Sequence, residues 1–261
     1  MKTDFSSSAG TMWIRDAWRI LKKSPLNILG IVGFYLTILF VVNIPGEFLG
    51  IDEIGVVLGT MVTPFAALAF ASAGRDVTHN VPFNILSAFY EGWRVSTIRF
   101  KLLALGFIYG ALVVFNNHVI RYLSASEVAQ WQFKDGIFVA ESISAHIPWT
   151  GIIVGSILYI LILFVTCFAP MLIAWRKQSI GKAFFFSLFV CLRNLLPFVA
   201  LGCCYFSIAL IGTIAVSTLS ILLGGLSSIV IIFWAIFMTA WCYCALWPMW
   251  VTFFGSDQSH V

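Results

Sequence analysis

Six long apolar stretches, separated by short polar or charged segments, dominate the pattern of this sequence. They cover residues 26–42, 54–73, 102–119, 152–175, 198–222 and 228–254. A helix needs about 20 apolar residues to cross a hydrocarbon core about 30 Å thick, and lipid leaves backbone polar groups no partner outside the helix. The pattern therefore predicts an all-α integral membrane protein, with six transmembrane helices in three hairpins that form one membrane domain over residues 1–261.

Three shorter segments, residues 12–23, 83–94 and 179–194, have the 3.6-residue period of an amphipathic helix. Projected at about 100° per residue, the charged side chains of 12–23 share an arc of about 120° opposite the apolar ones. Each segment precedes an outgoing span and is too short and too charged to cross, which predicts three amphipathic helices in the cytoplasmic interface. The residues expected to contact this interface are Trp13, Trp18, Arg19, Lys22, Lys23, Trp93, Arg94, Arg176, Lys177, Lys182 and Arg193.

Together these segments indicate an internal repeat: an amphipathic helix, a span out, an external connection and a span back. Each returning span contains one proline between apolar residues, at Pro64, Pro170 and Pro248. Because proline removes one helical hydrogen bond and clashes with the preceding turn, the pattern predicts a kink in each returning span.

Composition and charge agree with this plan. The chain is 61% hydrophobic and only 10% charged, against about 25% charged in an ordinary soluble domain.

Of the fifteen basic residues, only Arg121 and Lys134 fall in connections on the side opposite the termini. The positive-inside rule then places both termini in the cytoplasm. The net charge of +4 indicates contact with anionic lipid rather than nucleic acid, because the basic residues flank the spans. About 25 residues, including Arg15, Arg19, Lys22 and Lys23, precede the first apolar stretch, so we expect a retained span and not a cleavable signal.

The external segment 120–150 is the only sizeable polar connection. Ser124 and Glu127 have the spacing of a capping box, which predicts a helix start there. In residues 133–138, Asp135–Gly136 lies between apolar residues, which is typical of a β-hairpin turn. A small ordered cap and a loose loop both fit this pattern.

The candidate chemistry is sparse. The six cysteines all fall toward the cytoplasmic half, where Cys203, Cys204, Cys242 and Cys244 could form a soft metal site; burial as small apolar residues is the favoured reading. Asp, Glu, Lys, Arg and His are absent from the middle of every apolar stretch, which counts against an ion-coupled transporter. Phosphate-loop, nucleophile-elbow and zinc-protease motifs are also absent. We expect no catalytic residue, cofactor or metal.

Glycine pairs spaced four residues apart occur in the second, third and fourth spans, at 55/59, 106/110 and 151/155. Such pairs let helices approach closely, either within the bundle or between protomers. Five partner spans in the same chain favour contacts within the bundle.

The motifs APM at 169–171, KAF at 182–184 and CLRNLLPF at 191–198 resemble those of a family of proteobacterial six-span inner-membrane proteins. That family is distantly similar to the membrane domain of some glycerophosphodiester phosphodiesterases. The resemblance implies the bacterial inner membrane as location, and it brings no catalytic residues.

The main hypothesis is a non-enzymatic inner-membrane protein that acts through membrane lipids, anionic on the cytoplasmic face, or through a membrane-protein partner. One alternative is a permease or channel for a small neutral or amphipathic solute, with a vestibule at the three proline kinks. Another is an immunity protein against a membrane-targeted toxin.

Overall fold

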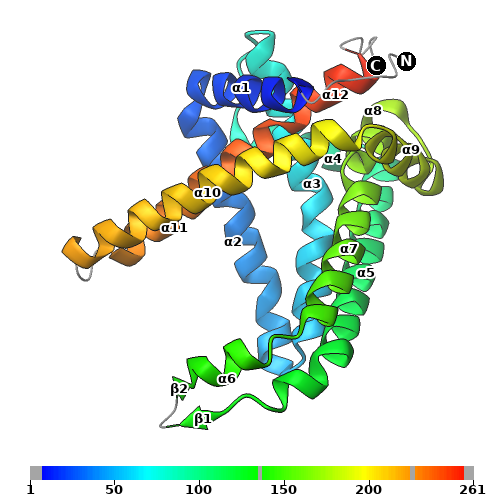
Figure 1. Cartoon of the computed structure of the whole chain (residues 1–261). Helices are drawn as coiled ribbons and strands as arrows, with labels where there is room; N and C mark the ends of the chain where they lie inside the picture. The colour runs from blue at the N-terminus through cyan, green and yellow to red at the C-terminus, as the bar shows by residue number, and fades with distance from the viewer. Residues whose placement is uncertain (1–7, 135–136, 224–226, 256–261) are drawn as a thin grey trace.

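The computed structural model describes residues 8–134, 137–223 and 227–255, and these residues are almost entirely helical (Figure 1). The helices are α1 (Ser8–Lys23), α2 (Pro25–Leu49), α3 (Asp52–Thr78), α4 (Ile85–Trp93), α5 (Ser96–Val128), α6 (Ala140–Ala145), α7 (Trp149–Thr166), α8 (Ala169–Arg176), α9 (Ile180–Arg193), α10 (Leu195–Leu223), α11 (Ser227–Cys244) and α12 (Leu246–Phe254). Two short strands, β1 (Phe133–Lys134) and β2 (Ile137–Phe138), pair antiparallel.

Six helical segments among the described residues are long and apolar enough to cross a membrane. They are Pro25–Leu49, Asp52–Thr78, Ser96–Val128, Trp149–Arg176, Leu195–Leu219 and Ser228–Phe254. Each overlaps one of the six apolar stretches. The prediction of an all-α multi-pass membrane fold is confirmed.

The spans do not form one parallel bundle. In Figure 1, α2, α3, α5 and α7 descend together, whereas α10 and α11 pair with each other and run obliquely away from the other four. The contacts agree, because α10 packs on α11, α1 and α9 but makes no extensive contact with α2, α3, α5 or α7. Most side chains of the third helical pair are therefore exposed on the protein surface, where membrane lipid is the surrounding solvent for apolar groups.

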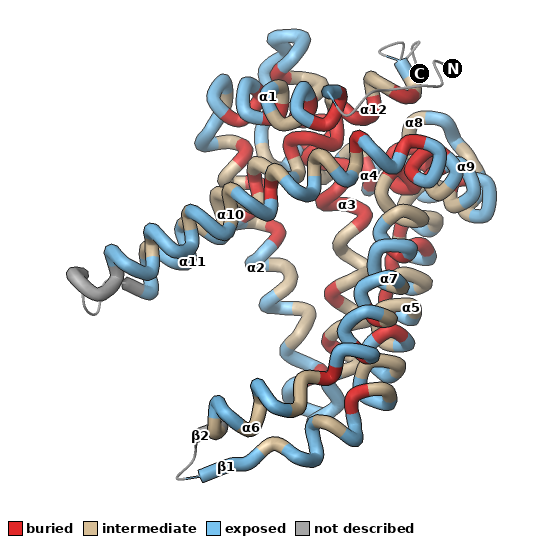
Figure 2. Tube along the Cα trace, viewed as in Figure 1, coloured by how far each residue is buried: buried red, intermediate tan, exposed pale blue. Residues whose placement is uncertain are grey.

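The core lies where the three returning spans meet. Figure 2 shows buried residues concentrated where α3, α8 and α12 converge, and this is the end of the molecule that carries α1, α4 and α9. Trp175 of α8 packs its ring against Trp250 of α12 with centroids 5.0 Å apart. Phe70 of α3 stacks on Tyr243 of α11 at 4.7 Å. The repeated proline segments thus form a shared aromatic centre.

The three prolines affect their helices differently. α3 continues through Pro64, whereas α7 ends three residues before Ala169, and Pro170 lies in the first turn of α8. Pro248 likewise lies in the first turn of α12, just after α11 ends at Cys244. Proline is tolerated in a first turn because its missing N–H would have no helical partner there.

A side chain from α9 bridges the break between α7 and α8. The Ser187 hydroxyl donates a 2.6 Å hydrogen bond to the Phe164 carbonyl and accepts a 3.0 Å bond from the Phe168 N–H. In an uninterrupted helix these two backbone groups would bond to each other, since they are four residues apart. Ser187 is fully buried. The break is therefore filled by a polar group from a neighbouring helix.

Each of the three short helices α1, α4 and α9 packs on a returning span. α4 packs on α3, and α9 packs on α7 and α8, so each lies on the span that precedes it in the chain. No span precedes α1 among the described residues, and α1 instead packs on α10, α11 and α12 from the opposite end of the chain.

The glycine pairs mark successive helix contacts within the chain. These are Gly55/Gly59 of α3 on α2, Gly106/Gly110 of α5 on α3, and Gly151/Gly155 of α7 on α5. At Gly106 a Cβ atom would lie 2.7 Å from the Thr60 carbonyl oxygen, so the backbones of α3 and α5 meet at a distance that only glycine permits.

The expected helix start at Ser124 is wrong. α5 runs without interruption from Ser96 to Val128, and Ser124 lies buried inside it, next to Gly151 of α7. The serine supports close packing there instead of capping a new helix. The short β1–β2 pair matches the hairpin pattern, while the Asp135–Gly136 turn falls outside the described residues.

Candidate functional site

An apolar groove of about 1090 Å³ lies between α2, α3 and α4. From α2 its lining runs from Phe34 to Pro45, and from α3 it runs from Leu58 to Phe65. Six residues of the α4 segment close one end. Ligand sites in proteins usually have about 300–1,000 Å³ and a mainly apolar lining with a few polar groups. The groove matches that description, and its polar groups, Asn84, Ser87 and Tyr90, all belong to the α4 segment.

Local sequence fixes α4 across this end of the groove. The Asn84 side chain accepts a 2.7 Å bond from the Ser87 N–H, and the Ser87 hydroxyl accepts a 3.1 Å bond from the Asn84 N–H. This reciprocal capping box satisfies donors that the first helical turn leaves free. Asn27 of α2 donates to the Phe83 carbonyl at 3.3 Å, which ties the α4 start to α2.

Aromatic contacts hold both sides of α4 against the spans. Phe89 meets Phe34 of α2 edge to face at 5.0 Å, and Trp93 packs on Phe65 of α3 at 5.6 Å. Gly92 turns toward the bundle, where a Cβ would come within 3.1 Å of the side chains of α3 and α5. α4 therefore lies flat on the spans, with the outer side of the helix exposed.

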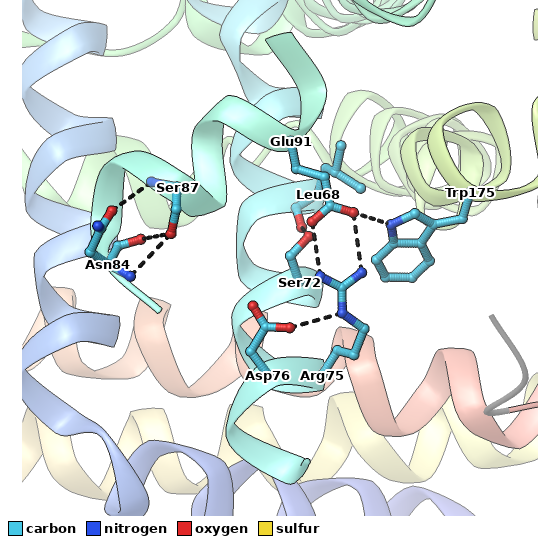
Figure 3. Close-up of polar contacts among 8 residues, drawn as sticks. All are labelled: Leu68, Ser72, Arg75, Asp76, Asn84, Ser87, Glu91 and Trp175. Carbon is cyan, nitrogen blue, oxygen red and sulfur yellow. Dashed lines mark hydrogen bonds and ion pairs between the residues drawn. The ribbon is translucent and has the colours of Figure 1, made fainter. Parts of the chain in front are cut away.

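A charged cluster lies on the opposite side of α4 (Figure 3). Both guanidinium N–H groups of Arg75 donate to the Glu91 carboxylate, at 3.1 and 3.2 Å, and its Nε donates to Asp76 at 2.9 Å. Trp175 of α8 donates its indole N–H to Glu91 at 2.6 Å, and the Arg75 guanidinium lies 5.6 Å from the Trp175 ring centroid. The cluster joins α3, α4 and α8.

The chemistry of this cluster is structural. A carboxylate that accepts three charge-assisted or indole hydrogen bonds is fully engaged, and Arg75 is paired with two acids. Nothing in it supplies a nucleophile or a metal ligand set. Among the described residues, no group of three or more His, Cys, Asp or Glu side chains could hold a metal ion.

The predicted interface residues are spread over four helices and their ends: α1, α4, α8 and α9. Arg19, Lys22, Lys23, Arg94, Arg176, Lys177, Lys182 and Arg193 are exposed, as are Trp18 and Trp93. Several of their cationic groups lie over aromatic rings: Lys22 lies over Trp18, and Arg193 lies over Phe189, each at 5.9 Å. No side chain from α1 or α9 lines the α2–α3–α4 groove.

Trp13 departs from its expected position. It is only 2% exposed, and its indole N–H donates a 2.9 Å bond to Thr252 of α12. Its ring also packs on Phe198 and Phe253. The apolar face of α1 is covered by protein because α1 packs on the third returning span, α11–α12.

The cysteines divide between surface and core. Cys203 and Cys242 are exposed on α10 and α11, while Cys191 and Cys244 are buried. All six thiols are free. In α9, a hydrogen bond with Cys167 and burial both raise the pKa of the Cys191 thiol, which keeps it protonated and unreactive at neutral pH. This arrangement fits packing rather than a thiolate site.

Sequence reasoning missed two polar contacts. The 3.6-residue period of 83–94 places Glu91 on the polar side, away from the apolar side chains, yet Glu91 turns inward to Arg75 and Trp175. The same period places Ser187 on the polar side of 179–194, yet Ser187 fills the α7–α8 break. A possible signal for Glu91 was the position of Arg75 at the end of a returning span, where an unpaired charge is costly.

A distant relative matches almost the whole chain. The chain is 24% identical to a "probable inner membrane protein" of Burkholderia thailandensis over 262 aligned residues, which cover 98% of this chain and 94% of the relative. No family model matches the chain. No solved structure matches it either. Together with the six apolar helices, the relative supports a multi-pass bacterial inner-membrane protein, and it lends no support to a link with glycerophosphodiester phosphodiesterases.

Proposed function

We propose that this protein is a non-enzymatic inner-membrane protein whose partner is membrane lipid, and that the α2–α3–α4 groove receives lipid acyl chains. The proposal includes the predicted orientation, with both termini and α4 on the cytoplasmic side. The observation that carries it is the groove itself, which is large, apolar and closed at one end by the polar side chains of α4.

The dimensions of the groove suit an acyl chain. Its α2 lining spans residues 34–45, which is about 16 Å along a helix at about 1.5 Å per residue. One leaflet contributes about half of a 30 Å hydrocarbon core. The groove therefore has the depth of one leaflet, and α4 lies at the level of the headgroups.

The proposal of a non-enzymatic role is supported by the charged cluster. Arg75, Glu91 and Asp76 satisfy one another and Trp175. They also lie on the side of α4 that faces away from the groove, so a lipid in the groove does not meet them.

Photo-crosslinking tests the proposal. Purified protein in bilayer nanodiscs is exposed to phospholipid with a diazirine in the acyl chain, and crosslinked peptides are mapped by mass spectrometry. We expect crosslinks concentrated on the α2 and α3 lining, and a several-fold loss of them in V41W, which fills the groove. The matched control is I157W, since Val41 and Ile157 are both β-branched and both 55% exposed, and Ile157 lies on α7 away from the groove.

Two results would overturn the proposal. The first is an even spread of crosslinks over all exposed helices, with V41W no different from I157W. The second is turnover of a lipid substrate by the purified wild-type protein.

A further inference from the structure

We infer that the groove selects an anionic phospholipid, whose headgroup is held by Arg94 and Arg99 beside the α4 end. This inference rests on the proposed function, since it names the lipid class that the same groove takes. It adds a headgroup site formed by two arginines that the apolar lining does not include.

The positions of the two arginines place them at the rim of the groove. Trp93 lines the groove as the last residue of α4, and Arg94 follows it directly as the C-cap residue. Arg99, in the first turn of α5, lies with its guanidinium 5.1 Å from the Trp93 ring centroid. Trp93 thus joins the acyl-chain site to both cations, because its ring contacts Arg99 and Arg94 is its neighbour in the chain.

The charges at this rim differ from those elsewhere in the same region. Arg75 is paired with Asp76 and Glu91, whereas Arg94 and Arg99 take part in none of the ion pairs found among the described residues. Arg94 is exposed, and Arg99 is half-buried against Trp93 and Phe100. The guanidinium of Arg99 contacts aromatic rings through cation–π interactions, and these leave its N–H groups available to an external acceptor.

Phosphate is the acceptor that suits this geometry. Arginine binds phosphate oxygens through two parallel N–H···O bonds, and these charge-assisted bonds are stronger than neutral ones. The Tyr90 hydroxyl gives a further polar group along α4 for a headgroup. An anionic headgroup offsets one of the two rim charges, whereas a zwitterionic headgroup has no net charge and offsets neither.

The test compares lipid classes on the intact protein. Nanodiscs made from equal amounts of phosphatidylglycerol and phosphatidylcholine, both with the same photoreactive acyl chain, report which headgroup accompanies crosslinks in the groove. A basic residue near a membrane surface contributes about 1 kcal/mol toward anionic lipid. We therefore expect wild type to favour phosphatidylglycerol roughly 5- to 30-fold, and R94Q/R99Q to lose most of this preference while total groove crosslinking persists.

Two further variants make the outcome specific. R94K/R99K keeps both charges and is expected to retain a reduced preference, which also shows that the site tolerates substitution. R193Q removes an exposed cation on α9, away from the groove, and is expected to change nothing.

The inference is overturned if R94Q/R99Q retains the wild-type preference, or if R193Q lowers the preference as much as the double variant does. Crosslinking in the groove without any headgroup preference would refute the inference and leave the proposed function intact. Absence of groove crosslinks in wild type would refute the proposed function itself.

Discussion

Replacing Ser187 with alanine isolates the contact that bridges the α7–α8 break. The serine hydroxyl holds the Phe164 carbonyl at 2.6 Å and the Phe168 N–H at 3.0 Å, in a fully buried position. The S187A substitution deprives both backbone groups of their hydrogen-bond partner at once, and it leaves a cavity no larger than one oxygen atom. Water does not readily replace the hydroxyl, because the surrounding side chains, such as Ala183 and Val190, are buried and apolar.

The expected cost follows from the two unsatisfied groups. A buried donor or acceptor that loses its partner costs about 1–3 kcal/mol, while hydrogen bonds between transmembrane helices average about 0.6 kcal/mol in measured cases. S187A affects two backbone groups, so each of these estimates applies twice. We expect S187A to lower the free energy of unfolding by about 2 kcal/mol, a value between the two resulting totals. At about 2–4 °C per kcal/mol for a chain of about this size, the midpoint of thermal unfolding should fall by roughly 4–8 °C.

Tryptophan fluorescence during heating in detergent measures this midpoint, and S156A is the matched control. Ser156 is exposed on α7, so its loss should change the free energy of unfolding by less than about 0.5 kcal/mol. An unchanged or raised midpoint in S187A would show that the Phe164 carbonyl and Phe168 N–H simply bond to each other when the serine is removed. The serine would then be an occupant of the break and not a support for it.

Two further contacts give predictions of similar size. G106A should destabilise the protein by about 1–3 kcal/mol, because the new Cβ would meet the α3 backbone. The control G33A should be neutral or slightly stabilising, because nothing lies within 4 Å of the Cβ that it adds. The midpoints of thermal unfolding of the two variants test this difference. E91Q and W175F should each destabilise and should couple by about 0.5–3 kcal/mol in a double-mutant cycle, since both act on one hydrogen bond. Additive effects would mean that the Trp175 N–H contributes nothing to holding Glu91.

Two patterns that depend on local chemistry, the length of apolar runs and the spacing of glycines, were read correctly from the sequence. The length of apolar runs sets helix length in lipid, so each of the six spanning segments overlaps a predicted apolar stretch, although Ser96–Val128 extends nine residues beyond the predicted end at residue 119. Glycine spacing also predicted close contacts, because a missing Cβ is visible in the sequence. The capping box at Ser124 failed because Gly151 of α7 packs there, and tertiary packing of a long helix outweighs a weak local signal.

Contacts that depend on a distant element could not be read in the same way. Helical periodicity places Glu91 on an outward polar face. A periodic pattern takes no account of partners in other helices, so water is the only partner it allows a carboxylate. The partner is Arg75, sixteen residues earlier, and the second donor is Trp175, eighty-four residues later. The groove was missed for the same reason, because its lining comes from α2, α3 and α4, and each contributes side chains that look like ordinary lipid-facing residues.

The position of α1 explains the remaining difference between pattern and structure. α4 and α9 each cover the returning span that comes just before them, but the third returning span, α11–α12, has no helix after it among the described residues. α1 takes that place: Trp13 bonds to Thr252, and the Trp241 indole N–H donates to the Ile14 carbonyl at 3.2 Å. The first helix of the repeat thus completes the last unit, which brings the two ends of the described chain together (Figure 1). A periodic pattern shows that three short helices exist, whereas only the packing shows which span each one covers.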